Sequence, residues 1–486
     1  MPDLAAPDYQ IARFAIERGL GAIYLIAFLV AVRQFPALLG EKGLEPAPKV
    51  LQATTFWQTP SLFHWRYSDR LLEIVAWIGI GLAAAILIGL PQAGPLPVTM
   101  LTWFLLWALY QSIVNVGGTF YSFGWESMLL EAGFLAIFLG NAETAPAFPL
   151  IVAFRWLAFR VEFGAGMIKL RGDKCWRNLT CMDYHHETQP MPNPLSWYFH
   201  RLPPPIHRLE AMGNFVAQLV LPFGLFLPQP VASIAALLMI GTQLYLVVSG
   251  NYAWLNWITI VVLFAAASDP VLSTVLPFWR PGAVIPLASW FAVTVIGLTA
   301  VILILSYRPA RNLLSRRQLM NASFDPLRLV NTYGAFGSVS RVRYEVVVEG
   351  TEADELDAVT AWREYEFNGK PGNPRRIPPQ VAPYHLRLDW LMWFLPLGSS
   401  FGESWLSPFL ARLLEGDRAT LALLRHDPFP SAPPTHVRAR LYRYRFTTWR
   451  ERRESGAWWV RTLVGEYVPP LRLRHDGDTE VGTLVA

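Results

Sequence analysis

The stretch VIPLASWFAVTVIGLTAVILILSYRPARNLLSRRQ, residues 284–318, decides the fold, because the last long apolar run of the chain ends within it. Residues 284–306 are apolar over the length that crosses the hydrocarbon core of a membrane, about 20 residues. Residues 306–318 then bring arginines and a proline. Further apolar runs lie upstream, whereas alternating segments lie downstream. The sequence therefore predicts a polytopic membrane domain over residues 1–317 and an extramembrane domain over residues 318–486.

The composition supports a membrane protein whose first partner is the lipid bilayer. Of 486 residues, 53% are hydrophobic and only 16% are charged, and the mean hydropathy is +0.29, which is too apolar for an ordinary soluble enzyme of this size. The net charge of +5 comes almost entirely from arginine, as is typical of a GC-rich, bacterial genome. It does not argue for a nucleic-acid partner. No motif for nucleotide, haem or flavin binding is present, so no cofactor is expected.

Nine apolar runs are candidates for membrane spans, and two of them are short, so we expect eight or nine transmembrane helices. Arg13, Glu17 and Arg18 precede or enter the first run and no small-residue cleavage site follows it, which predicts a retained helix rather than a signal peptide. The runs lie near residues 19–36, 71–91, 98–119, 127–141, 149–169, 212–228, 231–249, 253–268 and 284–306.

The charges of the connecting segments leave the orientation open. Short loops rich in Lys and Arg face the cytoplasm, and the segments 33–70, 171–210 and 308–317 are all basic. A cytoplasmic position for the long loop 171–210 implies reduced cysteines, whereas a disulfide there requires the opposite side of the membrane.

The long polar loop carries most of the ionisable chemistry. Its core, GDKCWRNLTCMDYHHETQPMPNPLSWYFHRLP (172–203), contains both cysteines of the chain, Cys175 and Cys181. Their C-x5-C spacing is too wide for the redox C-x-x-C pattern. A structural disulfide and a pair of unpaired thiols are both compatible with this spacing.

Three neighbouring residues of the loop, His185, His186 and Glu187, are candidates for general acid or base work. With Asp183 they also offer metal ligands, yet adjacent side chains diverge in most backbone conformations and no H-x3-H helical spacing is present. We therefore predict no metal site and expect hydrogen bonds that fix the fold of the loop.

The apolar run at 149–169, PLIVAFRWLAFRVEFGAGMIK, contains four charged residues, Arg155, Arg160, Glu162 and Lys169. A charge at membrane depth costs about 2.5 to 3.5 kcal/mol on insertion scales and usually faces a partner or a wet cavity. Two readings follow, a buried network of ion pairs and a site for an anionic substrate. The partners expected in the preceding helix are Glu126 and Glu131.

Two segments of the C-terminal part alternate apolar and charged residues, which predicts strands. They are RVRYEVVVE (341–349) and RARLYRYRF (438–446). The string GAFGSVSR (334–341) imitates the glycine-rich loop of a kinase, but no strand lysine, HRD or DFG motif follows, so it predicts a turn before a strand. The expected C-terminal domain is mostly β.

Four longer strings run in order over nearly the whole chain and are rich in Trp, Cys, His and Pro. They are FYSFGWESMLLEAGFLAIF (120–138), RWLAFRVEFGAGMIKLRGDKCW (155–176), NTYGAFGSV (331–339) and PYHLRLDWLMWF (383–394). On these strings the chain resembles the lipase maturation factor family. PSLFHWRYSD (60–69) is also loosely similar to the helical membrane domain of vitamin K-dependent carboxylases.

The resemblance implies a membrane-embedded assistant of secretory folding. Eukaryotic members reside in the membrane of the endoplasmic reticulum, are needed for certain dimeric lipases to mature, and engage the client with a luminal C-terminal domain. By analogy this chain is expected in a bacterial inner membrane, with its C-terminal domain in the periplasm and secreted proteins, lipases among them, as partners.

The main functional hypothesis is therefore a noncatalytic, chaperone-like protein. Exposed aromatic side chains of the C-terminal domain are expected to supply apolar contact area for clients. The residues predicted for this role are Tyr384, Trp390, Trp393, Trp458, Trp459 and Tyr467.

The alternative hypothesis is a membrane enzyme whose site lies where the loop 172–203 meets the charged helix 149–169. A third reading, a transporter, lacks an obvious inverted repeat. In the enzyme, the base would be His185, His186 or Glu187, and the anchor for an anionic substrate would be Arg155, Arg160 or Lys169.

Overall fold

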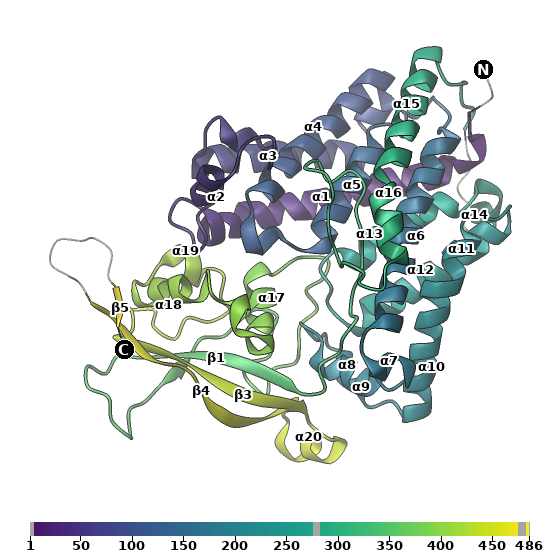
Figure 1. The fold of residues 1–486 in the computed structure, drawn as a ribbon. Coiled ribbons are helices and arrows are strands. Elements are labelled where there is room, and N and C mark those ends of the chain that lie inside the picture. Colours follow the sequence, from purple (N-terminus) through teal and green to yellow (C-terminus); the bar gives the residue numbers. More distant parts are fainter. Residues whose placement is uncertain (1–3, 276–281, 475–482, 486) are drawn as a thin grey trace.

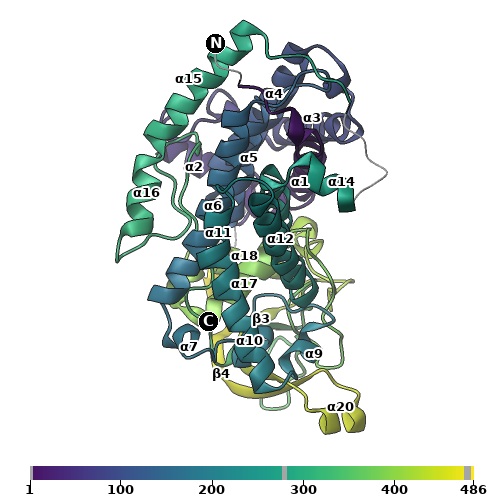
Figure 2. The same cartoon turned by 90° about the vertical axis from the view of Figure 1, so that its right-hand side faces the viewer.

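A layer of helices stands on a C-terminal sheet in the computed structural model, which describes residues 4–275, 282–474 and 483–485 (Figure 1). The helices run between two ends of the layer. We call the end that faces the sheet the proximal end and the opposite end the distal end. Seen at right angles, the chain begins at the distal end and its last strands lie beyond the proximal end (Figure 2).

Nine helical passages join the two ends in alternation in the described part of the chain. At the distal end, backbone hydrogen bonds connect Ala6 with Pro146 and Ala142 with Gln92. The passages are α1 (Gln10–Leu39), α3 (Asp69–Ile88), α4 (Leu96–Asn115), α5 (Gly124–Ala136), α6 (Phe148–Arg171), α10 (Pro204–Phe215) continued by η5 (Val216–Val220) and α11 (Leu221–Gly224), α12 (Val231–Ser249), α13 (Leu255–Leu263) continued by η6 (Phe264–Ala266), and α15 (Ser289–Leu305).

Five helical stretches among the described residues are long and apolar enough to cross a membrane, so the chain is a helical membrane protein. They are Pro7–Leu39, Asp69–Ile88, Leu96–Asn115, Val231–Ser249 and Ser289–Leu314. The eight or nine spans expected from the sequence also need α5, α6, α10–α11 and α13, which are shorter or, in α6, interrupted by charge. Their count as spans stays a prediction.

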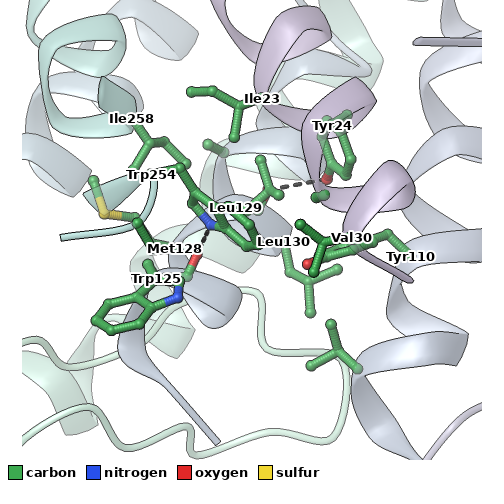
Figure 3. Close-up of a cluster of buried hydrophobic side chains, with 14 of the residues drawn as sticks. Ile23, Tyr24, Val30, Tyr110, Trp125, Met128, Leu129, Leu130, Trp254 and Ile258 are labelled. Carbon is green, nitrogen blue, oxygen red and sulfur yellow. Dashed lines mark hydrogen bonds between the residues drawn. The ribbon is translucent and has the colours of Figure 1, made fainter. Parts of the chain in front are cut away.

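Aromatic side chains hold the centre of the helical layer (Figure 3). Tyr24 of α1 is fully buried and donates a hydrogen bond to the carbonyl oxygen of Leu129, 3.0 Å away. Trp254 donates from its indole nitrogen to the carbonyl oxygen of Trp125 at 3.3 Å. These bonds satisfy the polar tips of large apolar side chains, which would otherwise cost free energy when buried.

The C-terminal sheet has five antiparallel strands in the order β2-β1-β3-β4-β5. The two strands predicted from alternation are confirmed as β1 and β3, which pair from Arg343 opposite Tyr444 to Thr351 opposite His436. The strands are β1 (Arg343–Thr351), β2 (Arg363–Glu364), β3 (His436–Phe446), β4 (Trp459–Arg474) and β5 (Thr483–Val485).

The C-terminal part holds more helix than the expected mostly-β domain. The segment 383–394, which holds three of the aromatic residues expected to be exposed, contains α17. Its residues 387–392 are all buried, so this helix is enclosed by the rest of the protein rather than exposed along one face. The added helices are α17 (Arg387–Phe394), α18 (Leu406–Leu414), α19 (Arg418–Leu421) and α20 (Trp449–Ser455).

The segment between the two parts lies along α6 rather than on the sheet. The side chain of Gln318 donates to the carbonyl oxygen of Gly164 at 3.0 Å. A Cβ atom on Gly164 would lie 2.3 Å from the carbonyl oxygen of Tyr333, so only glycine permits this approach. The kinase-like string ends up in this segment, directly before β1. The predicted domain boundary at 317/318 therefore falls inside a segment that belongs by its contacts to the helices.

The long polar loop docks on the sheet through Trp197, which is fully buried. Its indole nitrogen donates to the carbonyl oxygen of Thr447 at 2.9 Å, and its ring packs with Trp458. Arg343 of β1 donates to the carbonyl oxygens of Glu187 and Pro190, each at 3.0 Å. The loop and the C-terminal sheet therefore form one body at the proximal end.

Candidate functional site

A cavity of about 1150 Å³ lies at the proximal end between α6, α10, α12 and α13. The segment 333–338 and α17 contribute further walls, so both parts of the chain enclose it. Most of the lining is apolar. Its polar residues include Glu162, Lys169, His185, Glu210, Asn214, Gln218, Gln243, Tyr252 and Asn256.

Two of the charges predicted on helix 149–169 meet in this cavity, and amides connect them. Lys169 Nζ donates to Asn214 Oδ1 at 2.8 Å and to Gln218 Oε1 at 2.9 Å. Gln218 Nε2 in turn donates to Glu162 Oε2 at 3.2 Å, and Gln243 Nε2 donates to Glu162 Oε1 at 2.7 Å. An ammonium and a carboxylate thus share one cavity without direct contact, an arrangement that can bind or exchange a proton with a polar ligand.

The other two charges of that helix lie outside the cavity. Arg155 donates to the carbonyl oxygens of Ala265 and Leu225 and to the hydroxyl of Tyr9, all at the distal end. Arg160 forms a buried ion pair with Glu131, as the sequence suggested. Both guanidinium groups therefore bind other parts of the protein. Of the three residues proposed to anchor an anionic substrate, only Lys169 reaches the cavity.

The loop histidines and Glu187 point in three directions, so they do not form one site. His185 Nε2 lies 2.8 Å from the hydroxyl of Tyr252 at the cavity wall, and burial lowers its pKa to about 3. His186 faces α10. Glu187 accepts a hydrogen bond from the backbone nitrogen of Phe446 at 2.7 Å, and burial raises its pKa. Of the three, only His185 lines the cavity.

A disulfide between Cys175 and Cys181 closes the start of the loop. Both residues are buried in a small cluster with Trp176, whose indole nitrogen donates to the carbonyl oxygen of Phe336 at 2.9 Å. Trp176 and Phe336 both line the cavity. The disulfide thus fixes one wall of the cavity against the segment that precedes β1.

Glu126 has a partner that the sequence did not suggest. Its Oε1 atom lies 2.8 Å from Arg387 and 3.7 Å from His385, and all three side chains are fully buried. Arg387 also donates to the carbonyl oxygen of Phe120 at 2.7 Å. The arginine sits in the apolar string RLDWLMWF, and a charge inside such a string is the one signal that pointed to a buried partner.

Three aromatic residues predicted to contact clients are not exposed, so that expectation was wrong for them. Trp390, Trp458 and Trp459 expose 3%, 8% and 2% of their surface, because Trp390 lies on the buried helix α17 and the other two pack in a cluster with Trp197. Tyr384, Trp393 and Tyr467 are half-buried, and Trp393 donates to the carbonyl oxygen of Thr188 at 3.1 Å.

The amides of the cavity were missed by the sequence analysis. Gln218, Gln243 and Asn256 lie within three of the predicted apolar runs, and Asn256 Nδ2 donates to Gln243 Oε1 at 2.7 Å. Uncharged polar residues inside apolar runs were the available signal, since such groups need partners in a bilayer.

Comparison with known proteins assigns both parts of the chain to one family. The profile of the lipase maturation factor transmembrane domain matches residues 11–274, and that of the lipase maturation factor C-terminal domain matches residues 329–469. No solved structure matches the chain at a significant level.

Relatives with curated names agree over almost the full length. Lipase maturation factor 1 of Mus musculus is 41% identical over 96% of this chain and 88% of its own length. The Bos taurus protein of the same name is 40% identical over 96% and 90%, and lipase maturation factor 2 of Xenopus laevis is 29% identical over 96% and 83%. The chain belongs to the lipase maturation factor family.

Proposed function

We propose that this protein assists the maturation of exported proteins, lipases among them, as the names of its relatives suggest. The observation that carries the proposal is the docking of the C-terminal sheet on the disulfide-closed loop at the proximal end. Disulfides persist in oxidising compartments. A domain that assists folding and lies next to a disulfide is therefore on the side of the membrane where exported chains fold. For a bacterial inner membrane that side is the periplasm.

Nine membrane passages complete the proposed topology. An odd number of crossings puts the two ends of the helical layer on opposite sides of the membrane. With the C-terminal domain in the periplasm, the distal end and the start of the chain then lie in the cytoplasm. Large apolar side chains such as Ile78 of α3, Leu238 of α12 and Leu303 of α15 are more than half exposed, as lipid-facing residues are. The basic residues of segment 308–317 favour the reverse orientation by charge, so the orientation is the first point to test.

Single cysteines at two exposed alanines test this orientation. Ala93 lies at the distal end and Ala358 in the C-terminal domain. With the native disulfide intact, a membrane-impermeant maleimide applied to whole cells should label Ala358→Cys directly and Ala93→Cys only after lysis. The reverse pattern would place the C-terminal domain in the cytoplasm and remove the basis for a role in exported-protein folding.

We propose that clients bind the outer edge of β4. β5 pairs only with Arg472–Arg474, and among the described residues no strand pairs with the outer edge of 460–471. Leu463 and Val464 on this stretch expose 49% and 54% of their surface. An unpaired apolar edge accepts a strand from another chain, which is the form in which a partly folded client presents its backbone.

A lysine on this edge tests the client site. Val464→Lys should reduce the yield of active exported lipase relative to total lipase antigen, in a host that lacks the native protein, because a charge on an edge strand opposes strand addition. Val359→Lys is the matched control, since Val359 is 86% exposed in the same domain and away from the edge. Equal yields for the two variants would exclude the edge as the client site.

The cavity favours one second function, a membrane-embedded enzyme. Lys169, Glu162 and His185 line a single space, and a base, an acid and a cation are the groups that proton-transfer chemistry uses. Glu162→Gln and Lys169→Met should then abolish maturation while client binding at β4 is retained. If both variants mature lipase normally, this function is excluded.

A further inference from the structure

Two histidines and a glutamate converge next to the cavity, and the proposed function uses none of the three. His186 Nε2 lies 3.3 Å from Glu210 Oε1, and His207 Nδ1 lies 2.6 Å from Glu210 Oε2. The side chains expose 1%, 4% and 7% of their surface for His186, His207 and Glu210. Tyr245 donates its hydroxyl to the same carboxylate.

We propose that His186, His207 and Glu210 bind a divalent transition-metal ion, with Zn²⁺ as the best match. Two imidazole nitrogens and one carboxylate oxygen form a ligand set that zinc takes in proteins. The ligand atoms lie within 4.8 Å of one another, so a modest closing of the cluster lets one ion contact all three. The proposal is independent of the maturation function.

The local fold explains why these residues meet. His207 and Glu210 are three residues apart on α10, so they share one helix face. His186 comes from α8 (Met182–Thr188), which the Cys175–Cys181 disulfide and the docking of the loop on the sheet hold against α10. The sequence analysis missed the site because it looked for ligands among consecutive loop residues, whereas two of the three lie on the next helix.

Two observations point to an ion rather than to hydrogen bonds alone. His186 Nδ1 is buried without a hydrogen-bond partner among the described residues, so hydrogen bonds alone leave this imidazole unsatisfied. Glu210 lines the cavity, so a bound ion would face space for a water or ligand.

The test measures zinc in the purified full-length protein. After treatment with EDTA, incubation with Zn²⁺ and desalting, we expect about one zinc per chain by elemental analysis. His207→Gln and Glu210→Gln should each lower this occupancy at least tenfold. His200→Gln is the matched control, a largely buried histidine of the same region outside the cluster, and should keep the zinc. Equal occupancy in the variants and the native chain would overturn the proposal.

A measurement on the unmodified protein guards against variants that fail to fold. Co²⁺ bound in place of Zn²⁺ gives visible absorption bands that report its coordination geometry. Native protein should develop these bands on addition of Co²⁺ and lose them when Zn²⁺ is added. Absence of the bands at saturating Co²⁺ would contradict a site made of two histidines and a carboxylate.

Discussion

Two of the places where the protein buries a glutamate with a cation differ in how the charges meet. At the junction of the helices and the C-terminal part, Glu126 and Arg387 lie 2.8 Å apart and are fully buried. In the cavity, Glu162 and Lys169 are joined only through Gln218. The first arrangement leaves no surface for a ligand, whereas the second faces about 1150 Å³ of space.

The difference separates a structural charge from a functional one. A buried pair in direct contact is held by mutual attraction and leaves an uncompensated charge when one partner is removed. A lysine and a glutamate that each hydrogen-bond to neutral amides are not in contact with each other and can pair with a third molecule. Sequence alone does not distinguish the two, since all four residues sit in apolar strings.

Removal of Arg387 should give the largest effect. Arg387→Ala leaves Glu126 buried without its guanidinium partner and should lower the free energy of unfolding by about 3–5 kcal/mol. The change is measured as loss of thermal stability and of expression in detergent. Arg450→Ala is the control, because the Arg450–Glu454 pair is largely exposed and should change stability by about 0.5 kcal/mol or less.

Acidification from pH 7.5 to 5.5 should destabilise both regions by a smaller amount. Burial lowers the pKa of His385, at the junction, and of His185, at the cavity wall, to about 3 each. Below about pH 6.5 the unfolded chain binds a proton at each histidine that the folded chain does not. Stability therefore falls as the pH drops from about 6.5 towards 3, by up to about 1.4 kcal/mol per pH unit for each histidine.

Chemical unfolding in detergent at pH 7.5 and 5.5 measures this slope. His185→Gln keeps a polar group for Tyr252. This variant should lose the contribution of His185 to the pH dependence of the free energy of unfolding and keep that of His385. A variant whose stability depends on pH as steeply as that of the native protein would show that His185 is not held neutral at the cavity.

Replacement of Lys169 should have the smallest effect on stability. Lys169→Met removes a buried charge that has no direct carboxylate partner and should leave the free energy of unfolding within about 1 kcal/mol of the native value, because the lost hydrogen bonds and the removed desolvation cost offset each other. Thermal melting of Lys169→Met and Arg387→Ala, measured side by side, checks this expectation. Equal losses in the two variants would remove the distinction between junction and cavity.

The apolar runs predicted the helical layer well, because membrane helices are decided by local composition. Each run overlaps a helix or a chain of helices. The strands β1 and β3 were also predictable, since alternation is a local pattern. Helix α17 was not, because its tryptophans were interpreted as a client surface.

The site depended on contacts that no local pattern encodes. Lys169 and Glu162 were proposed from their cost in a membrane, and that argument also selected Arg155 and Arg160, which the fold uses elsewhere. The partners that separate these cases lie far along the chain, as with Glu126 and Arg387. The amides and the His186, His207 and Glu210 cluster depend on the packing of α10 and α12, which a single sequence does not specify.

The contact between the helices and the C-terminal part also forms late in the synthesis of the chain. Trp125 and His385 stand 260 residues apart in the chain, and Glu126 meets Arg387 beside them. At about 5–20 residues per second, roughly 13–50 s pass between the synthesis of the two. Until then the carboxylate of Glu126 has the hydroxyl of Tyr110 as its partner in the helical part but lacks its guanidinium. Completion of α17 is therefore the event that supplies the counter-charge of Glu126 and closes the contact between the two parts of the chain.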